Sequence, residues 1–132
     1  MKLGFVNGCF DVLHVGHIAL FNFCKSFCDY LIVGIDSDER VGAHKGSNRP
    51  FNTSVDRMTM LRSIRLVDEV RVFSTDSELA QLIEGISPDV MVVGSDWKGK
   101  KVIGSEFAKE LKFFRRINGY STTKILESSS DR

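Results

Sequence analysis

Short, continuous apolar segments recur along this chain, and segments with helical periodicity separate them. The apolar segments are residues 3–6, 30–35, 69–73, 90–93 and 113–114. The helical patterns cover residues 15–27, 54–64, 76–83 and 105–111, and a last one begins near residue 121. Apolar strands without alternation, joined by helices, are typical of a parallel sheet covered on both faces. We therefore predict an α/β fold: a Rossmann-like, doubly wound, five-stranded parallel sheet with helices on both faces.

Polar residues predict where two of the helices begin. Thr53 or Ser54 is the expected N-cap of the second helix, and Asp76 or Ser77 that of the third, because hydroxyl and carboxylate oxygens accept the free N–H groups of a first helical turn. Residues 42–52 are polar and are expected to form a loop. The 132 residues fit one domain, which we place at 1–127, with a frayed tail at 128–132.

Charge and cysteine content exclude several classes of function. Lys and Arg number 18 against 17 Asp and Glu, with no basic stripe, which argues against a nucleic-acid partner. No apolar run approaches the ~18 residues of a membrane span, and the N-terminal segment breaks too early for a signal peptide. Cys9, Cys24 and Cys28 are an odd set and favour reduced thiols in a cytoplasmic protein. Cys24 and Cys28 lack a second pair of ligands, so we expect no protein-held metal.

The segment between the first strand and the first helix combines two histidines with a glycine. His14 and His17 are three residues apart, and Gly16 lies between them. Where the turn becomes a helix, both imidazoles can point to the same side, and Gly16 allows a phosphate to approach the backbone. The helix N-terminus adds N–H donors and positive potential. In doubly wound folds, ligands bind beyond the carboxyl ends of the strands, here residues 7–11 and 94–97, so this pattern predicts a polyphosphate site.

A second anion-binding pattern occurs near the C-terminus. Arg116 precedes a group of hydroxyl residues, Ser121 and Thr122, at the predicted start of the last helix. Hydroxyls at a helix N-terminus with an arginine alongside suit a phosphate. An ordinary N-cap is the alternative for the serine.

Both patterns resemble known motifs. Gly8-Cys9-Phe10-Asp11 followed by His14-Val15-Gly16-His17 resembles the signature of the cytidylyltransferase-like nucleotidyltransferases, and residues 116–125 resemble the Arg-x-x-Gly-x-Ser-Thr-Thr stretch of that superfamily. The resemblance extends from residue 1 to about residue 127. It implies transfer of a nucleoside monophosphate from an NTP to a small phosphorylated acceptor, with release of pyrophosphate. It also implies Mg²⁺ bound through the NTP phosphates, and a homodimer.

Two subfamilies compete. Residues 64–70 and 94–100 resemble glycerol-3-phosphate cytidylyltransferase, which has a similar chain length, whereas residues 45–52 and 103–106 resemble the adenylyltransferase domain of ADP-heptose synthase. Ser95 replaces an acidic residue of the cytidylyltransferase pattern, near the expected base. We favour the cytidylyltransferase; the alternatives are an adenylyltransferase acting on a sugar 1-phosphate and a non-catalytic nucleotide-sensing module. Either enzyme would serve synthesis of a cell-envelope polysaccharide.

The resemblance assigns roles to individual residues. His14 and His17 would donate to the α- and β-phosphates, Lys45 would close over the phosphates or hold the acceptor phosphate, and Arg116 would clamp the β/γ-phosphates. The expected nucleotide-binding residues are Gly8, Cys9, Phe10, Asp11, Gly16, Gly94, Asp96, Tyr120, Ser121 and Thr122. The expected acceptor-binding residues are Asp38, Arg57, Arg65 and Trp97. Structural alternatives remain open: a turn cap for Asp11, an N-cap for Asp38, a strand-end turn for Asp96, loop packing for Trp97 and ordinary surface positions for the arginines.

Overall fold

The computed structural model describes residues 1–116. Tyr120, Ser121, Thr122 and the last predicted helix lie outside the described residues. The strands are β1 (Leu3–Gly8), β2 (Tyr30–Asp36), β3 (Glu69–Phe73), β4 (Val90–Gly94) and β5 (Glu110–Phe114). The helices are α1 (Val15–Lys25), α2 (Asp38–Lys45), α3 (Ser54–Arg62) and α4 (Asp76–Ile86), with short 3-10 helices η1 (Ser95–Trp97) and η2 (Ser105–Phe107).

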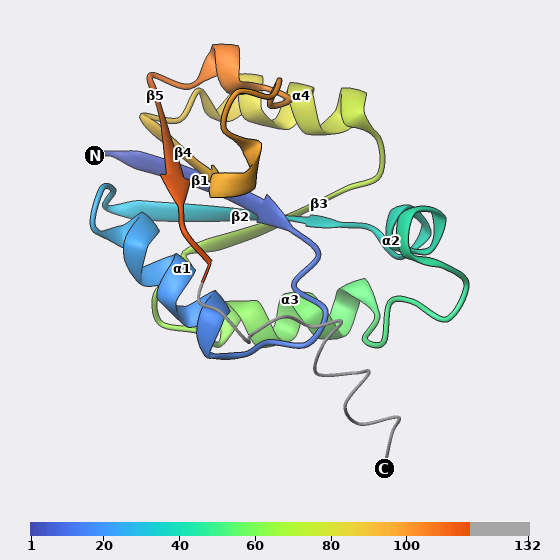
Figure 1. The fold of residues 1–132 in the computed structure, drawn as a ribbon. Coiled ribbons are helices and arrows are strands. Elements are labelled where there is room, and N and C mark those ends of the chain that lie inside the picture. Colours follow the sequence, from blue (N-terminus) through green and yellow to red (C-terminus); the bar gives the residue numbers. More distant parts are fainter. Residues whose placement is uncertain (117–132) are drawn as a thin grey trace.

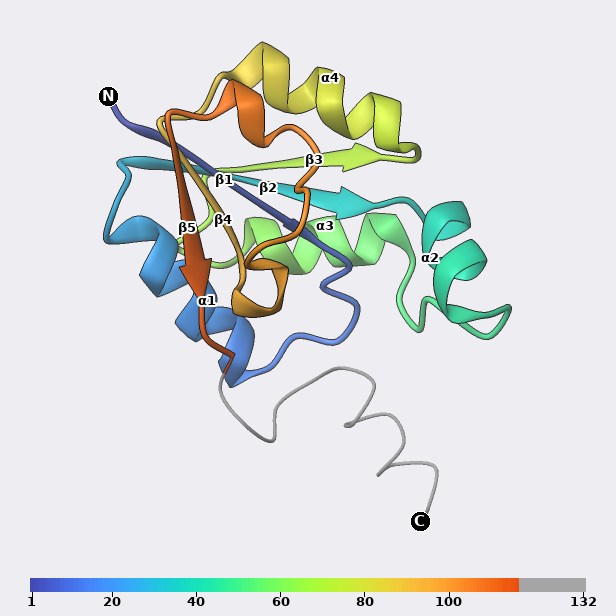
Figure 2. The same ribbon diagram turned by 45° about the horizontal axis from the view of Figure 1, so that its top comes forward.

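The sheet confirms the predicted fold class. All five strands are parallel, in the order β3-β2-β1-β4-β5. From β1 the chain adds β2 and β3 on one side, and then returns to add β4 and β5 on the other side (Figures 1 and 2). The direction in which strands are added therefore reverses between β1 and β4, so the loops that follow the carboxyl ends of these two strands separate and leave a crevice.

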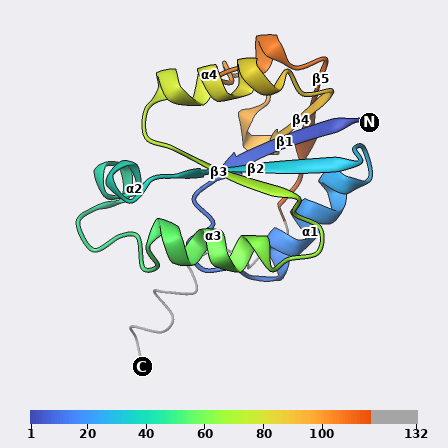
Figure 3. The same ribbon diagram turned by 180° about the vertical axis from the view of Figure 1, so that it is seen from behind.

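An apolar layer covers each face of the sheet. Figures 1 and 3 show α1 and α3 on one face and α4 on the other. Phe21 and Cys24 of α1 and Leu61 of α3 are fully buried on the first face, and Leu79 and Ile83 of α4 are buried on the second. Because the central strands are apolar on both faces, burial of both layers fixes the strand order and the position of the crevice.

The predicted helix over residues 105–111 is wrong. Only Ser105–Phe107 is helical, as one 3-10 turn, and β5 begins at Glu110 rather than near residue 113. Gly104 has a φ of 81°, and Ala108 is already extended, so no α-helical turn can form between them. Glu110 pairs with Val90 of β4, which draws the segment into the sheet. Tertiary pairing overrides the local helical pattern here.

Helix α2 was not among the predicted helical patterns, because residues 42–52 read as a polar loop, although an N-cap at Asp38 was left open; Asp38 is instead the first residue of the helix. Only Val41 of this helix is buried, so no apolar face signals it in the sequence. Ser37 caps it, with its hydroxyl accepting from the N–H of Arg40 (3.2 Å). The predicted cap Thr53 of α3 is confirmed, whereas α4 is capped by Thr75 instead of Asp76 or Ser77.

Two sequence expectations concern the chain as a whole. Cys9, Cys24 and Cys28 are free thiols, and none forms a disulfide. Among residues 1–116, none of the helices has the length and apolar character needed to cross a bilayer.

Candidate functional site

A cavity of about 560 Å³ lies at the carboxyl ends of β1 and β4, in the predicted crevice. Its lining combines polar and charged residues with apolar ones. The polar and charged lining residues include Asn7, Cys9, His14, His17, Arg40, Lys45 and Arg116. The apolar lining residues include Leu79, Val93, Trp97, Val102, Ile103 and Phe114. A nucleotide also combines charged phosphates with a base that presents flat apolar faces, so this mixed lining suits it.

The two histidines form the N-terminal cap of α1. Nδ1 of His14 accepts a hydrogen bond from the N–H of Gly16 (3.1 Å), and Nδ1 of His17 accepts one from the N–H of His14 (3.2 Å). Two of the free donors of the first turn are thereby satisfied. The first turn of α1 contains no acidic residue, so its positive potential is not neutralised locally.

The cap determines which ring nitrogen carries the proton. Because Nδ1 of each imidazole accepts from a backbone N–H, the proton of the neutral ring lies on Nε2. The rings of His14 and His17 stack with centroids 3.8 Å apart. Each neutral ring is therefore a hydrogen-bond donor through Nε2–H, without needing a positive charge.

Phe10 holds His17 in place. Its φ of 51° lies in the left-handed region, which is unusual for a residue other than glycine. The ring packs edge-on against His17 at 5.2 Å and against Phe21 of the core at 5.4 Å. A Cβ on Gly8 would lie 3.1 Å from that ring, so glycine at position 8 makes room for Phe10. The turn predicted to bind phosphate thus also orients the second histidine.

Burial and neighbouring positive charges keep both histidines neutral. Burial lowers the pKa of His14. For His17, burial is the main cause, and the charges of His14, Arg116 and Lys45 act in the same direction, so that its pKa falls to about 4. Lys45 and Arg116 line the same cavity as His17. Burial raises the pKa of Cys9, against the opposing effects of Lys45 and Arg57, so Cys9 is a neutral thiol.

We expect His17 to titrate near pH 4 in the free protein, and its pKa to rise when a polyphosphate binds. NMR titration of the imidazole with and without inorganic triphosphate measures both. A histidine with a lower pKa in the folded than in the unfolded chain destabilises the fold on protonation, so stability should decline as pH falls from about 6.5 towards 4. His17→Gln should remove this part of the acid dependence. A midpoint near 6.5 in the free protein would contradict the assignment.

The turn after β4 brings three predicted residues together. A Cβ on Gly94 would lie 2.5 Å from Oδ1 of Asp96 and 3.7 Å from Nε of Arg116, so glycine at position 94 allows this close approach. Gly94, Trp97 and Arg116 line the cavity, and 44% of Trp97 is exposed. Asp96 is exposed beside Gly94 and is not among the lining residues. The structure thus joins the β4 turn to the arginine at the end of β5.

Asp11 contacts the chain itself. Its carboxylate is fully buried and accepts from the N–H groups of Phe51 (2.7 Å) and Asn52 (2.7 Å) and from Nε of Arg49 (3.2 Å). Nδ2 of Asn52 donates to the carbonyl oxygen of Asp11 (2.7 Å). Asp11 therefore joins residues 49–52 to the segment between β1 and α1 that carries His14 and His17, which we call the histidine turn. Neither of the expected roles of Asp11, nucleotide binding or capping of its own turn, describes this contact.

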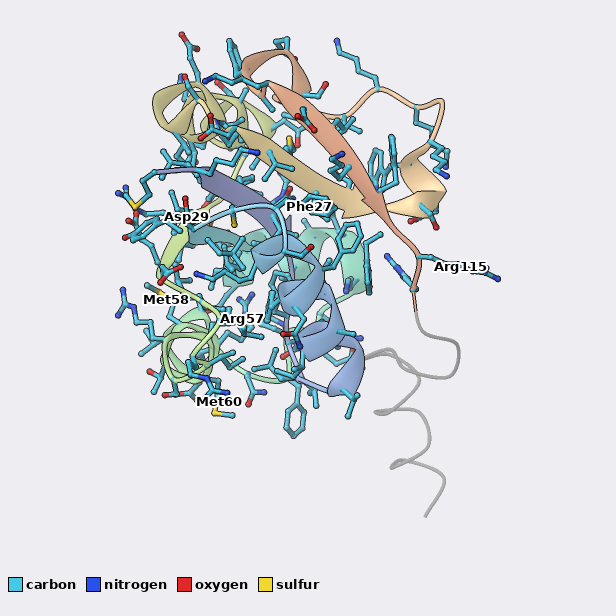
Figure 4. All side chains as sticks on the ribbon, turned by 90° about the vertical axis from the view of Figure 1, so that its left-hand side faces the viewer. Phe27, Asp29, Arg57, Met58, Met60 and Arg115 are labelled. Atoms are coloured by element: carbon cyan, nitrogen blue, oxygen red, sulfur yellow. The ribbon has the colours of Figure 1, made fainter. Side chains whose placement is uncertain are left out.

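Arg57 is buried and pairs with the partly exposed Asp38, and neither residue lines the cavity. Nη1 of Arg57 donates to the carbonyl oxygens of Cys9 (2.9 Å) and Asp36 (2.8 Å). Its Nε donates to the carbonyl of Asn52 (3.1 Å), and its Nη2 to Oδ1 of Asp38 (2.7 Å). Figure 4 shows Arg57 directed from α3 into the molecule, where it is 1% exposed. Its donors are occupied by the chain, so the structure does not present Arg57 to an acceptor.

Arg65 is not brought to the cavity. Helix α3 ends at Arg62, and Arg65 is exposed in the turn before β3, at the amino ends of the strands. Of the four expected acceptor-binding residues, only Trp97 lines the cavity. The opposite edge of the sheet carries the cavity.

Several lining residues were missed in the sequence. Leu79 lies in the predicted third helix and is 4% exposed, but it also lines the cavity. Val102 carried no signal in the sequence, whereas Ile103 belongs to residues 103–106, which resemble the adenylyltransferase domain. Arg40 follows Asp36 by four residues, a spacing that permits the ion pair observed between them.

Within residues 1–116, the structure contains no group of three His, Cys, Asp or Glu side chains placed to hold a metal ion. The carboxylate nearest the histidine turn, Asp11, is occupied by the chain's own donors.

Comparison with known proteins gives consistent matches. The sequence matches the Cytidylyltransferase-like family over residues 5–128. The Bifunctional protein HldE of Campylobacter fetus is 47% identical over 122 residues, which are 92% of this chain and 26% of that protein. The HldE protein of Sulfurimonas denitrificans is 48% identical over 126 residues, 96% of this chain and 26% of that protein. The chain thus spans about a quarter of the length of these curated relatives.

Solved structures agree on the fold. A lipopolysaccharide core biosynthesis protein from Thermoplasma volcanium superposes with a TM-score of 0.69 at 21% identity, covering 87% of this chain and 98% of that one. A pantoate-beta-alanine ligase from Francisella tularensis superposes with a TM-score of 0.56 at 15% identity, covering 98% and 69%. With the family match over nearly its whole length, the chain belongs to the cytidylyltransferase-like family of nucleotidyltransferases.

Proposed function

We propose that this chain is an ATP-dependent adenylyltransferase that acts on a sugar 1-phosphate of the heptose type. The type of reaction is supported by one observation: two Nε2–H donors, from His14 and His17, lie in one cavity with Lys45 and Arg116. All four side chains can donate hydrogen bonds to one bound anion. Among residues 1–116, neither Lys45 nor Arg116 forms an ion pair.

The choice of ATP is supported by the relatives. The sequence patterns favoured a cytidylyltransferase narrowly, but the curated relatives at 44–48% identity are HldE proteins, whose matched quarter we take as the counterpart of the ADP-heptose synthase adenylyltransferase domain. Residues 45–52 and 103–106, which resemble that domain, carry Lys45 and Ile103 of the cavity. The adenylyltransferase alternative therefore replaces the cytidylyltransferase as the leading hypothesis.

The proposed reaction is an in-line displacement at phosphorus. A phosphate oxygen of the acceptor attacks the α-phosphorus of ATP, a new P–O bond forms, and the bond to the bridging α,β-oxygen breaks with release of pyrophosphate. A phosphate dianion is already nucleophilic, so no strong base is needed. The chain's contribution is to position the two reactants and to offset charge that builds up on the transferred and leaving groups.

The neutral histidines suit that contribution. Nε2–H of His14 and His17 would donate to oxygens of the α- and β-phosphates, and these bonds strengthen as negative charge develops. Lys45, at the C-terminus of α2, and Arg116, after β5, both line the cavity and would hold the remaining phosphate oxygens. The free N–H groups of α1 add to the same field.

We infer that Mg²⁺ enters bound to the triphosphate. When bound, Mg²⁺ lowers the negative charge of the phosphates and makes pyrophosphate a better leaving group. The chain's residues would act on the nucleotide: the donors at the α1 N-terminus would orient the α-phosphate, and the apolar lining residues would exclude water around the base.

Thermal unfolding tests the choice of nucleotide. We expect ATP with Mg²⁺ to raise the Tm by several degrees and CTP, GTP and UTP to raise it less, since a ligand at about 100 times its Kd adds about 2.7 kcal/mol. Release of pyrophosphate from ATP with a heptose 1-phosphate, against CTP with glycerol 3-phosphate, then tests the acceptor. Inorganic triphosphate serves as the control for binding through phosphates alone.

A second candidate is a cytidylyltransferase acting on a polyol phosphate. The turn at residues 94–100 and the segment 64–70 favour it, and Trp97 of that turn does line the cavity. A selective shift with CTP would establish this function in place of the first. If none of the four nucleotides shifts the Tm, the proposed nucleotide-binding function is wrong.

A further inference from the structure

Arg40 connects two walls of the cavity. Its Nε donates to Oδ1 of Asp36 (2.8 Å) at the end of β2, and its Nη2 donates to Oδ1 of Asp76 (2.7 Å), the first residue of α4. Its Nη1 lies 3.4 Å from the carbonyl oxygen of Ser74, and the guanidinium carbon is 5.2 Å from the ring centroid of Phe73. One side chain therefore spans the ends of β2 and β3, α2 and α4.

Helix α2 needs such an anchor because its own packing is slight. It has eight residues, and only Val41 is buried. A helix this short is marginal without tertiary contacts. Its carboxyl end runs into Gly46, which has a φ of 107°, and into exposed residues 46–48. The ion pairs that attach α2 to the rest of the fold lie at its amino end. Arg40 pairs there with Asp36 and Asp76, and Asp38 pairs with Arg57.

The carboxyl end of α2 carries Lys45, a candidate ligand of the phosphates. Five residues separate Arg40 from Lys45, about 7.5 Å along a helix axis. A tilt of α2 about its amino end would therefore displace the Lys45 amine by ångströms. Lys45 lines the same cavity as Cys9, His14 and His17, so such a displacement would change its distance from the two histidines.

We propose that Arg40 is a positioning residue: by fastening α2 to the ends of β2, β3 and α4, it holds Lys45 over the phosphate site. The inference rests on the proposed nucleotide-binding function and adds a residue that the family motifs do not contain. Lysine would not replace it, because a single ammonium lacks the planar fork that reaches two carboxylates and a carbonyl at once.

Direct recognition of a substrate by Arg40 is the competing explanation, since the residue also lines the cavity. Against it, 14% of the side chain is exposed, and Nε, Nη1 and Nη2 each have a partner within the chain. Two carboxylates, of Asp36 and Asp76, neutralise its charge. Lys45 and Arg116 form no ion pair among the described residues, so they offer a phosphate more than Arg40 does.

A double-mutant cycle separates the two explanations, with the Kd of inorganic triphosphate measured by calorimetry as the readout. We expect Lys45→Ala to weaken binding by about 10-fold, Arg40→Met by about 5- to 10-fold, and the double variant by little more than Lys45→Ala alone. Arg40→Met combined with Arg116→Ala should instead show the product of the two single effects, because Arg116 does not reside on α2. Arg71→Met, which removes an exposed arginine paired with Glu69, is the matched control and should bind like the wild type.

Three results would overturn the proposal. The first is that Arg40→Met and Lys45→Ala weaken triphosphate binding independently, so that their effects multiply in the double variant. The second is that Arg40→Met is coupled to Lys45→Ala and to Arg116→Ala by the same amount. The third is that Arg40→Met leaves the Kd of triphosphate unchanged. If Arg40→Met fails to fold, Asp76→Ala removes the acceptor of one bond of the fork at a residue whose side chain is 69% exposed, and it should weaken binding about 2- to 3-fold, again only when Lys45 is present. Absence of triphosphate binding by the wild type overturns the proposed function itself, which distinguishes the two failures.

Discussion

Replacing His17 by alanine is expected to lower kcat by at least about 10²-fold, with a modest loss of nucleotide affinity. The Nε2–H of His17 donates to phosphate oxygens whose negative charge grows as the reaction proceeds, so the bond contributes more in the transition state than in the ground state. An interaction of that kind appears in kcat rather than in KM. Steady-state kinetics with ATP and a sugar 1-phosphate, together with the Kd of ATP, separate the two effects.

The structure supplies a control for this variant. His44 lies exposed on α2 and does not line the cavity, so His44→Ala should retain wild-type turnover. His17→Ala also removes the acceptor for the N–H of His14, at a cost of about 1 kcal/mol for a lost helix cap, and the Tm shows whether the fold survives. Turnover of His17→Ala close to that of the wild type would remove His17 from the mechanism.

The histidine turn could be predicted because its chemistry is local. Both Nδ1 bonds join residues at most three apart, and the glycine that permits phosphate approach lies between the two rings. The parallel sheet could also be predicted, since continuous apolar segments separated by helical patterns have few other solutions. The switch between β1 and β4 then follows, and with it the place of the cavity.

What supports the turn could not be predicted, because its partners are distant in the chain. Asp11 meets residues 40 or more positions away in Phe51 and Asn52, and Arg57 reaches back 48 positions to Cys9. Asp11 and Arg57 match binding motifs, but the fold buries both side chains and occupies them with hydrogen bonds to other parts of the chain. Helix α2 has no apolar face that a sequence pattern could reveal, because polar contacts hold it in place.

The choice between ATP and CTP could not be made from composition or spacing. The apolar lining residues, including Leu79, Val102 and Ile103, have no hydrogen-bonding side chains. A base that packs against them would be recognised by shape and by the backbone, and a sequence does not reveal backbone geometry. The relatives, rather than a single residue, therefore favour adenylyl transfer.

Replacing Asp11 by alanine is expected to reduce the free energy of unfolding by about 3–5 kcal/mol, because it leaves the Arg49 charge and the N–H groups of Phe51 and Asn52 without the carboxylate that accepts from them. For a domain of this size the Tm should fall by about 10 °C or more. Thermal and urea unfolding without ligand measure the change. Asp56→Ala, at an exposed carboxylate on α3, is the control and should cost less than about 1 kcal/mol.

Asp11→Asn distinguishes the structural role from a role in binding the triphosphate or its metal. Asparagine keeps the shape and one acceptor oxygen but loses the charge and the second acceptor, so two N–H donors and Arg49 compete for one oxygen. We expect it to lose roughly half of the stability lost by Asp11→Ala. A ligand-binding role would leave the unliganded Tm unchanged and abolish only the shift caused by Mg²⁺ and ATP. Because Asp11 fixes residues 49–52 at one end of the segment that begins at Lys45, the structural role instead predicts that stability and nucleotide affinity fall together.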